Sequence, residues 1–530
     1  MMHGEINQPN HNYINPDSPP DKNLYLNKSQ RRVLLLAAAV SSGSGLAVEL
    51  LLGNLASYLT GNQALAYGIS VGGFLAAMGL GSYLTQYIAT TSQGQQLQRE
   101  LLLAVTCVEL AIAPLTAILP LGLFALFVSD GAMLWQALFI VTIILGTLAG
   151  MEVPIMVRIL ELSDNMRQAI AGVLALDYLG GLVGSLGFPL LFLPWLGMFP
   201  TAFVLGAFPA LMVSMMGRLF PKIRRLGYIG LILGILLFTA APITIPFSNN
   251  LENNLYNAPV IKRVQSRFQR IVLTRKGQDV RLFLDGDLQF STIDEYRYHE
   301  ALVHPAMSAT PNHQNVLVLG AGDGMAVREI LKWQDVKKVT LIELDPEMIK
   351  IATRYPQIAS TNAHSLQDPR VQVINADAFT TAPELPDIYN VIIADFPDPD
   401  RDNLAKLYSE GFYRRLITRL ADDGILVTQA SSPFFTPKVI SCINTTIAAT
   451  GLKTHPYVID VPSFGVWGYV LASRHQLDPS QLQLQVPTRY LTTSLLQHIF
   501  DLPKDIQLVQ TQVNRLSQPV IVRYQMQTRT

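Results

Sequence analysis

Five acidic residues in the second half of this 530-residue chain have positions that suit a binding site. Each follows or closes a short apolar run of the kind that forms a buried strand: Asp323, Glu343, Asp377, Asp395 and Asp398. If these strands run parallel, ligands bind outside their carboxyl ends, where the acids would meet. A ring of carboxylates repels phosphate groups and attracts cations. The predicted ligand is therefore either a cation that carries a nucleoside or a polyamine.

The nucleoside part of this prediction comes from residues 315–345. An apolar run of strand type is followed there by a glycine-rich turn and then by a helical pattern. The glycines of the turn are Gly320, Gly322 and Gly324. A side chain at such a turn would keep a ligand from the backbone, and the N-terminus of the helix offers unpaired N–H donors. Glu343 lies roughly 20 residues beyond the turn, where the ribose-binding acid of a doubly wound sheet belongs. The alternative is a turn with a purely structural role.

Other ligands have less support in the sequence. No Walker lysine follows the glycines and no basic pair lies in the adjacent loops, which argues against a nucleotide or dinucleotide phosphate. With only Cys107 and Cys442 as cysteines, we expect no disulfide framework, no metal site and no metal catalysis. A single acid at a strand end can also be a helix cap, which is the alternative for Asp377.

The composition is uneven along the chain. Hydrophobic residues make up 49% and charged residues only 15%, which is too apolar for an ordinary soluble protein. Long runs with almost no charge fill residues 33–247, whereas residues 251–530 have the mixed composition of a soluble α/β domain. We place the main boundary near Ser248. The formal net charge is zero, so we expect no nucleic-acid partner.

We divide the chain into five parts. They are a disordered cytoplasmic tail (1–30), a multi-pass membrane domain (31–248), a small antiparallel β domain (251–292), a Rossmann-like domain (293–480) and a C-terminal extension (481–530). In the β domain, Asp285-Gly286 between two β-type runs is a hairpin signal. In the next part, strands alternate with helices, which indicates a mainly parallel sheet. The predicted fold is an all-α transmembrane bundle, then a small β domain, then an α/β Rossmann-like domain.

Seven apolar segments are long enough to span a bilayer, so we expect an integral protein of the cell membrane. They lie near 33–55, 67–89, 101–120, 134–156, 169–193, 196–216 and 227–247. Basic residues occur in alternate connections, beginning with Arg31 and Arg32, which puts the N-terminus in the cytoplasm. Seven spans would place the C-terminal domain outside the cell, and one span more or fewer would place it in the cytoplasm.

Four acids lie inside these apolar segments: Glu49, Glu109, Glu152 and Asp177. An ionised carboxylate in hydrocarbon costs at least about 2.5 kcal/mol, so these side chains should face the bundle interior or water. They either serve a function there or fix helix packing through hydrogen bonds, aided by small-residue runs such as that from Gly180 to Gly184.

Several separated motifs in residues 264–475 resemble those of the polyamine aminopropyltransferases, whose usual member is spermidine synthase. They are SRFQ at 266–269, LFLDGDLQFSTIDEYRYHEALVHP at 282–305, GAGDG at 320–324, LIELD at 341–345, NADAF at 375–379, ADFPDP at 394–399, LYSEGFY at 407–413 and VPSFGVWGYVLAS at 461–473. The YHE and DxxDP elements separate this pattern from ordinary methyltransferases of the same nucleoside-binding fold. Some bacterial members are similar to this chain in full, with a multi-span membrane domain ahead of the catalytic one.

The resemblance implies a role for each matching residue. The thioadenosine would be held by Gln269, Glu343, Asp377 and Ala378, with Glu343 on the ribose hydroxyls and the Asp377 loop at the adenine. The amines would be met by Tyr298, His299, Asp323 and Asp398, of which Asp398 helps to hold the acceptor amine. Asp395 matches the proton acceptor.

The implied reaction needs no metal and no resident cofactor. The co-substrate, decarboxylated S-adenosylmethionine, has an electrophilic carbon beside a sulfonium, and transfer of its aminopropyl group to putrescine gives spermidine and methylthioadenosine. Family members are commonly dimers or tetramers, so a homodimer or homotetramer is implied as well.

Two departures from the usual pattern concern the acceptor more than the reaction class. Phe464 stands where many members have a tyrosine hydroxyl, and the segment 400–406 replaces the usual glycine-proline loop with one extra residue. The open alternatives are a different amine acceptor, a methyl transfer, or a polyamine sensor or transporter without turnover.

Overall fold

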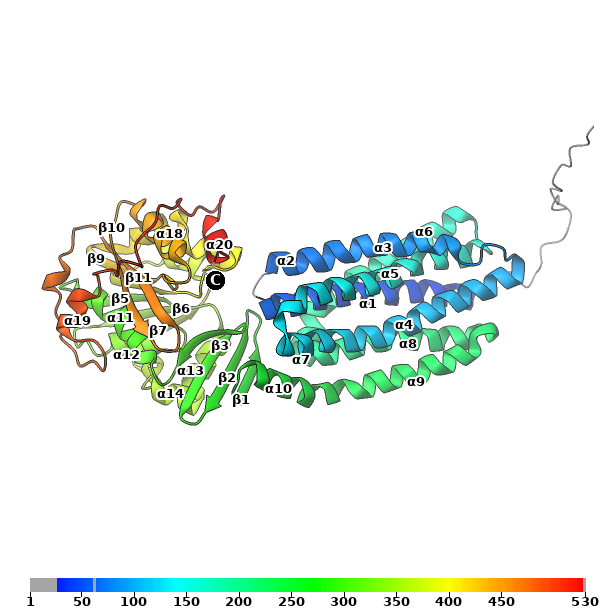
Figure 1. The fold of residues 1–530 in the computed structure, drawn as a ribbon, viewed down its shortest axis with the longest axis horizontal. Helices are drawn as coiled ribbons and strands as arrows, with labels where there is room; N and C mark the ends of the chain where they lie inside the picture. Colours follow the sequence, from blue (N-terminus) through cyan, green and yellow to red (C-terminus); the bar gives the residue numbers. More distant parts are fainter. Residues whose placement is uncertain (1–25, 61–62, 528–530) are drawn as a thin grey trace, which may run out of the picture. The chain divides into compact units, whose positions relative to one another are not determined.

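The computed structural model describes residues 26–60 and 63–527, so most of the predicted N-terminal tail lies outside the described residues. The chain forms two compact units (Figure 1). The second unit comprises residues from Pro246 onward together with the segments Asn54–Ala66 and Phe124–Gly131, and the first unit comprises the rest. Pro246 lies close to Ser248, where the change in composition places the boundary.

The first unit is built of helices. They are α1 (Lys28–Thr60), α3 (Gly73–Leu84), α4 (Gly94–Ser129), α5 (Leu134–Glu161), α6 (Met166–Gly187), α7 (Leu193–Leu196), α8 (Met198–Leu219) and α9 (Arg224–Ala240), followed by α10 (Thr244–Leu255). Helix α2 (Gln63–Tyr67) lies almost entirely in a segment of the second unit. Among the described residues, seven helical stretches are long and apolar enough to cross a membrane by length and composition. They are Lys28–Thr60, Leu65–Tyr87, Gly94–Ser129, Gly131–Glu161, Met166–Leu196, Met198–Leu219 and Pro221–Leu255.

Glycines allow the backbones of α1 and α6 to touch. A Cβ at Gly180 would lie 1.9 Å from the carbonyl oxygen of Ala39, and one at Gly184 would lie 1.9 Å from that of Gly43. Such contacts are possible only where both faces carry small residues, which is how apolar helices associate closely. The run from Gly180 to Gly184 therefore fixes helix packing.

Of the four acids in the apolar segments, three are buried and Asp177 is half-buried. Glu49, Glu109 and Glu152 are buried. Ser41 of α1 donates a hydrogen bond to Glu152 of α5. Because that hydroxyl has only one hydrogen, it cannot also serve Glu109 of α4, whose carboxyl oxygens have no hydrogen-bond partner among the described residues. Burial inside the helical unit agrees with the cost of exposing a carboxyl to hydrocarbon.

The second unit begins with a four-stranded antiparallel sheet of order β1-β2-β3-β4. Its strands are β1 (Val260–Gln265), β2 (Arg270–Lys276), β3 (Asp279–Leu284) and β4 (Asp287–Ser291). Asp285 and Gly286 join β3 to β4 with φ values of 51° and 100°. Aspartate and glycine tolerate positive φ, so this hairpin forms where the residue pair predicts it.

A seven-stranded sheet forms the centre of the second unit, with the order β10-β11-β9-β8-β5-β6-β7. Its strands are β5 (Asn315–Gly320), β6 (Lys338–Glu343), β7 (Val371–Asn375), β8 (Tyr389–Asp395), β9 (Leu420–Gln429), β10 (Lys453–Val461) and β11 (Gly465–Ser473). Strands β5 to β9 are parallel to one another. Strands β10 and β11 form an antiparallel hairpin at one edge, where β11 pairs with β9. The chain leaves β5 toward β6 on one side and returns to β8 on the other. This change of direction is the switch point at which doubly wound sheets bind ligands.

Helices cover both faces of this sheet. They are α11 (Glu295–Ser308), α12 (Met325–Ile330), α13 (Pro346–Arg354), α14 (Pro356–Thr361), α15 (Ala378–Thr381), α16 (Asp402–Ala405), α17 (Glu410–Leu416), α18 (Pro437–Ala448), α19 (Thr493–His498) and α20 (Val520–Gln525). Successive residues of β5 enter opposite cores: Val316 and Val318 pack in one cluster, and Leu317 and Leu319 in the other. Burial on both faces explains why this strand is a continuous apolar run.

The C-terminal extension is tied to α11 by Glu300. This carboxylate is fully buried and accepts hydrogen bonds from the backbone N–H groups of Arg489, Tyr490 and Leu491, at 2.5, 2.8 and 2.9 Å. Glu300 stands next to His299 in the sequence, but its side chain points to the extension. Its place in the motif is therefore explained by stability of the fold.

Glu300 provides a test of this attachment. Its replacement by alanine leaves three backbone donors without an acceptor, of which that of Leu491 is buried and the other two are partly buried. An unpaired buried group costs about 1–3 kcal/mol. We expect Glu300→Ala to lower the melting temperature of the purified protein by several degrees, and the exposed Glu384→Ala to leave it within error. Equal melting temperatures for both variants would contradict the assignment.

Candidate active site

The predicted site residues come together at the carboxyl ends of the parallel strands. Gly320 at the end of β5 pairs in register with Asp395 at the end of β8, and Glu343 at the end of β6 pairs with Asn375 of β7. A single cleft is lined by Gln269, Tyr298, His299, Gly320, Gly322, Asp323, Glu343, Asp377, Ala378, Asp395 and Asp398. Gly324 is not part of its lining and instead has a left-handed conformation (φ 81°) at the start of α12.

Two glycines of the turn are required by their neighbours. A Cβ at Gly320 would lie 2.1 Å from the carbonyl oxygen of Asp395, and one at Gly322 would lie 2.6 Å from the carboxylate of Glu343. The sequence predicts glycine here to let a ligand approach. In the structure, the same glycines also let the ends of β5, β6 and β8 approach one another.

Asp395 lies between a tyrosine and a histidine of α11. The hydroxyl of Tyr298 donates to its Oδ1 at 2.5 Å. Desolvation by the surrounding protein raises the pKa of Asp395 to about 6, against the opposing effects of His299 and of the Tyr298 hydrogen bond. The carboxyl is therefore mostly ionised at neutral pH and close enough to its pKa to exchange a proton.

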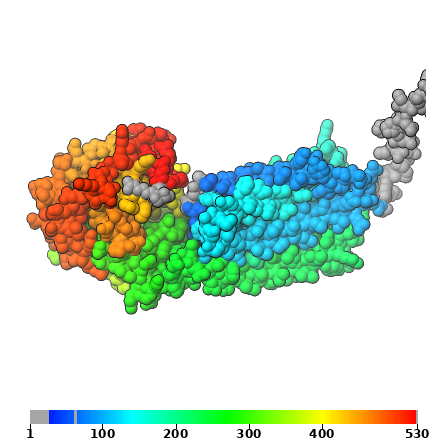
Figure 2. Space-filling model, viewed as in Figure 1, coloured from blue at the N-terminus to red at the C-terminus, as the bar shows by residue number. Residues whose placement is uncertain are grey.

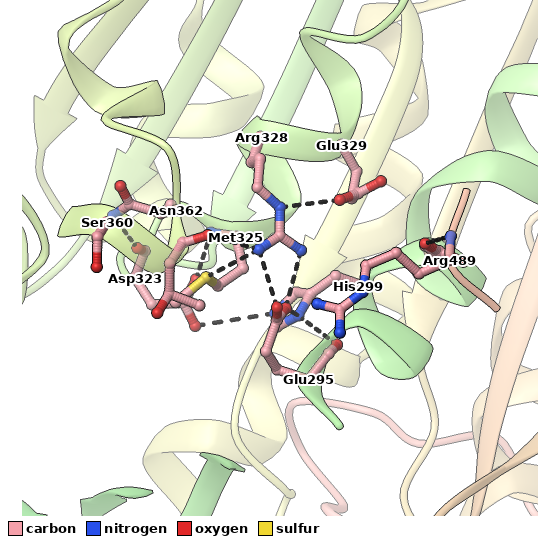
Figure 3. Close-up of polar contacts among 12 residues, drawn as sticks. Glu295, His299, Asp323, Met325, Arg328, Glu329, Ser360, Asn362 and Arg489 are labelled. Carbon is pink, nitrogen blue, oxygen red and sulfur yellow. Dashed lines mark hydrogen bonds and ion pairs between the residues drawn. The ribbon is translucent and has the colours of Figure 1, made fainter. Parts of the chain in front are cut away.

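His299 is held as a cation by acids on two sides (Figure 3). Its Nδ1 lies 2.8 Å from the carbonyl oxygen of Glu295 and 3.0 Å from Glu295 Oε2, and its Nε2 lies 3.9 Å from Asp323 Oδ2. Burial alone lowers the pKa of His299, but Glu295 and Asp323 outweigh it and raise the pKa to about 9. A protonated imidazole cannot act as a base near neutral pH, so His299 contributes positive charge to the cleft.

Glu295 is in turn oriented by Arg328 of α12. The guanidinium donates to both carboxylate oxygens of Glu295 at 2.9 Å, and a further 2.9 Å contact joins it to Glu329 (Figure 3). Sequence reasoning did not identify Glu295 or Arg328. The available signal is the spacing of Glu295 and His299, which lie four residues apart on one face of a helix.

The two carboxylate oxygens of Asp323 have different neighbours, one in the turn and one at the histidine. Its Oδ1 accepts a hydrogen bond from the backbone N–H of Met325 at 2.8 Å, and its Oδ2 faces His299. Burial raises the pKa of Asp323 above its usual range, although His299 opposes this effect. The side chain thus helps to begin α12 and also lines the cleft.

Glu343 and Gln269, which are expected to hold the nucleoside, line the cleft. Burial raises the pKa of Glu343 to about 7, and its Oε1 accepts from the backbone N–H of Asp345 at 2.8 Å. Gln269 does not reach Glu343 itself, because its Nε2 donates to Asp345 Oδ2 at 3.1 Å. Gln269 and Glu343 are therefore linked through Asp345, which also caps α13.

Asp377 caps a helix, which is one of the alternatives that the sequence leaves open, and it also lines the cleft. Its Oδ1 caps α15 by accepting from the backbone N–H of Phe379 at 2.9 Å, and its Oδ2 pairs with Lys406 at 2.6 Å. The adjacent Ala378 is buried against the cleft. Two basic residues lie near the site: Arg401 lines the cleft, and Lys406 pairs with Asp377. Because Arg401 is bound to Asp285 at 3.0 Å, both cations are already paired with acids.

Asp398 lies at the other end of the cleft and is surrounded by neutral donors. Its Oδ2 accepts from Ser431 Oγ at 2.8 Å and from Gln525 Nε2 at 3.1 Å. Desolvation raises the pKa of Asp398 to about 6, and these hydrogen bonds oppose the rise. Asp287 and Asp400 line the same end of the cleft. Sequence reasoning missed Ser431, Gln525, Asp287 and Asp400, although Asp287 stands within a quoted motif.

The fold is a Rossmann-like domain with an acidic cleft at the carboxyl ends of its parallel strands. Within the described residues, no group of three or more His, Cys, Asp or Glu side chains is arranged to hold a metal ion. A profile of the Spermine/spermidine synthase domain matches residues 295–481.

Curated relatives extend this match over almost the whole chain. A polyamine aminopropyltransferase of Oceanobacillus iheyensis is 36% identical over 492 residues, which cover 90% of this chain and 92% of the relative. Polyamine aminopropyltransferase 2 of Ralstonia nicotianae is 38% identical, with 93% and 97% covered, and polyamine aminopropyltransferase 1 of Streptomyces coelicolor is 38% identical, with 96% of each covered. The chain belongs to the polyamine aminopropyltransferase family and is an enzyme of this type.

A solved structure of a spermidine synthase in complex with the transition-state analogue AdoDATO aligns with 46% of this chain and 85% of its own. The two chains are 28% identical over that region, and the TM-score is 0.44. In this family, decarboxylated S-adenosylmethionine is a co-substrate, and the enzymes use no resident cofactor.

Methylthioadenosine binding tests the nucleoside end of the cleft. Hydrogen bonds to a charged acceptor contribute about 1.5–3 kcal/mol, so loss of the Glu343 carboxylate should weaken binding roughly 10- to 100-fold. We expect Glu343→Gln to reduce the affinity for methylthioadenosine, measured by calorimetry on the full-length protein, whereas Glu347→Gln outside the cleft should not. Equal affinities in the two variants would remove Glu343 from the nucleoside site.

Proposed function

We propose that this enzyme transfers the aminopropyl group of decarboxylated S-adenosylmethionine to putrescine, giving spermidine and methylthioadenosine, with Asp395 as the proton acceptor. The observation that carries the proposal is the position of Asp395 at the end of β8, beside Tyr298 and within the same cleft as Glu343. This arrangement joins a nucleoside end to a base.

The residues around Asp395 suit the chemistry of the step. The acceptor nitrogen forms a bond to the carbon beside the sulfonium, the carbon–sulfur bond breaks, and its electron pair stays on sulfur in neutral methylthioadenosine. The acceptor nitrogen must first lose a proton, because an ammonium has no lone pair. Since Tyr298 donates to Oδ1, we assign Oδ2 of Asp395 as the oxygen that takes this proton.

The other acids of the cleft support an acceptor with two positive charges. Asp395 and Asp398 lie at the ends of one acidic region, and a diamine presents one nitrogen to each. His299 is a fixed cation behind Asp323, so it offsets part of the negative charge without competing for the proton. Putrescine is the simplest amine of this kind, and it gives the product expected of a spermidine synthase.

Substitution of Asp395 tests the assigned base. Loss of a general base costs about 10²–10⁴ in turnover, so we expect Asp395→Asn to reduce kcat by that factor. The measurement is mass-spectrometric detection of spermidine and methylthioadenosine from the detergent-purified full-length enzyme. The exposed Asp387→Asn, which loses a contact with Lys338, should retain full activity.

The pH dependence has a defined sign. The base must be ionised, and the pKa of Asp395 is about 6 in the free enzyme, so kcat/KM should fall as the pH decreases through about 6.

Spermidine production by Asp395→Asn at the rate of the unsubstituted enzyme would exclude Asp395 as the acceptor.

We further infer that the helical unit is embedded in the cell membrane with the N-terminus in the cytoplasm. The seven long apolar stretches support this placement, as does the alternation of basic residues in their connections. The lipid bilayer is then a partner of the protein, and the cost of burying acids in it makes the inward-facing carboxyls candidates for a function of their own.

Movement of a polyamine through the helical unit is a second candidate function. It is favoured by the buried Glu109, which has no hydrogen-bond partner among the described residues, and by Glu152, which has only the Ser41 hydroxyl on one oxygen. A buried carboxyl without a cationic partner can accept a proton or an ammonium group.

Vesicle uptake measures this second function directly. If the helical unit moves polyamines, Glu152→Gln should abolish uptake of labelled putrescine by proteoliposomes but leave aminopropyl transfer unchanged. Glu161→Gln, at the exposed end of α5, serves as the control. No uptake by the unsubstituted protein would end this candidate without affecting the enzyme assignment.

A further inference from the structure

The last helix of the described chain contributes to the active site. Helix α20 lies beyond residues 295–481, which match the family domain. Its Val520 and Ile521 are buried in the core that also contains α17 and α18. The C-terminal residues, in red, lie at the surface of the second unit (Figure 2). The last residue of this helix, Gln525, and the residue after it, Met526, line the cleft.

Asn514 anchors the segment that leads to α20. Its side-chain amide donates to the carbonyl oxygens of Ala405 and Tyr408 at 2.9 and 3.1 Å, and its Oδ1 accepts from the backbone N–H of Ile521 at 3.4 Å. Asn514 is fully buried. The extension is therefore fixed to Ala405, within the 400–406 segment, and to Tyr408 just after it. This segment is also where the chain departs from the usual family pattern.

Gln525 is oriented so that its amide N–H points to Asp398. The Nε2 donates to Asp398 Oδ2 at 3.1 Å, and Oε1 lies 3.4 Å from Ser431 Oγ. The Ser431 hydroxyl is a closer partner of Asp398, at 2.8 Å, and is itself buried. Two neutral donors thus converge on one carboxylate oxygen. They stabilise its ionised form without supplying a positive charge that would compete with an amine.

We propose that Gln525 is a positioning residue that determines which amine is accepted. This proposal rests on the proposed function, in which Asp398 holds the non-reacting amino group of the acceptor. The amide of Gln525 keeps Asp398 ionised and aimed along the cleft. Its side chain, with that of Met526, also limits the length of an acceptor that extends past Asp398. Acceptor choice is then set in part by the C-terminal extension, outside the shared catalytic domain.

Gln525→Leu is the test, because leucine has a similar volume but cannot donate a hydrogen bond. A hydrogen bond to a charged group corresponds to roughly a 10-fold or larger change in affinity, so KM for putrescine should rise by about this factor. We expect kcat and the KM for decarboxylated S-adenosylmethionine to stay within about 2-fold. The pH below which KM for putrescine rises should also move upward, since Asp398 loses a donor that favours its ionised form.

A smaller side chain tests the length limit. Gln525→Ala should raise the kcat/KM for longer diamines and for spermidine relative to that for putrescine, because space opens beyond Asp398. Gln527→Leu is the matched control, since Gln527 is an exposed residue of the same segment that contacts Lys438 at 2.8 Å outside the cleft. It should leave all of these parameters unchanged.

The outcomes separate this proposal from the proposed function. If the unsubstituted enzyme transfers aminopropyl groups to no amine, the proposed function fails and Gln525 has no acceptor to position. If it is active, but Gln525→Leu leaves the KM for putrescine and its pH dependence unchanged, the role of Gln525 is overturned. A lower melting temperature with equal losses in both KM values and kcat would also overturn it, because a merely structural residue acts in that way.

Discussion

Several carboxylates are gathered in one cleft of the second unit, where the protein removes much of their hydration. The rest of the unit depends on this constraint. Carboxylates at the ends of β6 and β8 and in the turns after β5 and β7 repel one another, and the surrounding protein removes much of their hydration. Each therefore needs donors or a cation. The structure provides these from different elements: the protonated His299 for Asp323 and Asp395, Lys406 for Asp377, and the amide of Gln525 for Asp398.

Helix α11, which packs against β8, β9, β10 and β11, supplies several of these contacts. Its Tyr298 and His299 reach the cleft, its Glu295 receives the guanidinium of Arg328, and its Glu300 holds the C-terminal extension. One helix thus contacts both Asp395 and the C-terminal extension. A displacement of α11 would change the hydration and the charge partners of Asp395 together, which is why its buried polar contacts matter beyond stability.

The elements that depend on local pattern could be predicted from the sequence, and the contacts between distant segments could not. The apolar run of β5, the glycine turn and the acids at strand ends follow from periodicity and turn chemistry. Of the twelve residues from Gln269 to Asp398 that were expected in the site, all but Gly324 line one cleft. The partners of these residues lie far away in sequence: Lys406 for Asp377, Asp345 for Gln269 and Gln525 for Asp398. No spacing rule joins such positions, because the fold itself brings them together.

The same electrostatics couple amine binding to protons. In the cleft without ligand, Asp395 and Asp398 have a pKa of about 6 and Glu343 about 7, so a fraction of these carboxyls is protonated near neutral pH. An ammonium group stabilises a neighbouring carboxylate and lowers its pKa, so entry of the amine drives protons out of the cleft. Binding therefore weakens as the pH decreases through 6. Burial disfavours the ionised form of these acids, and a cationic substrate restores it.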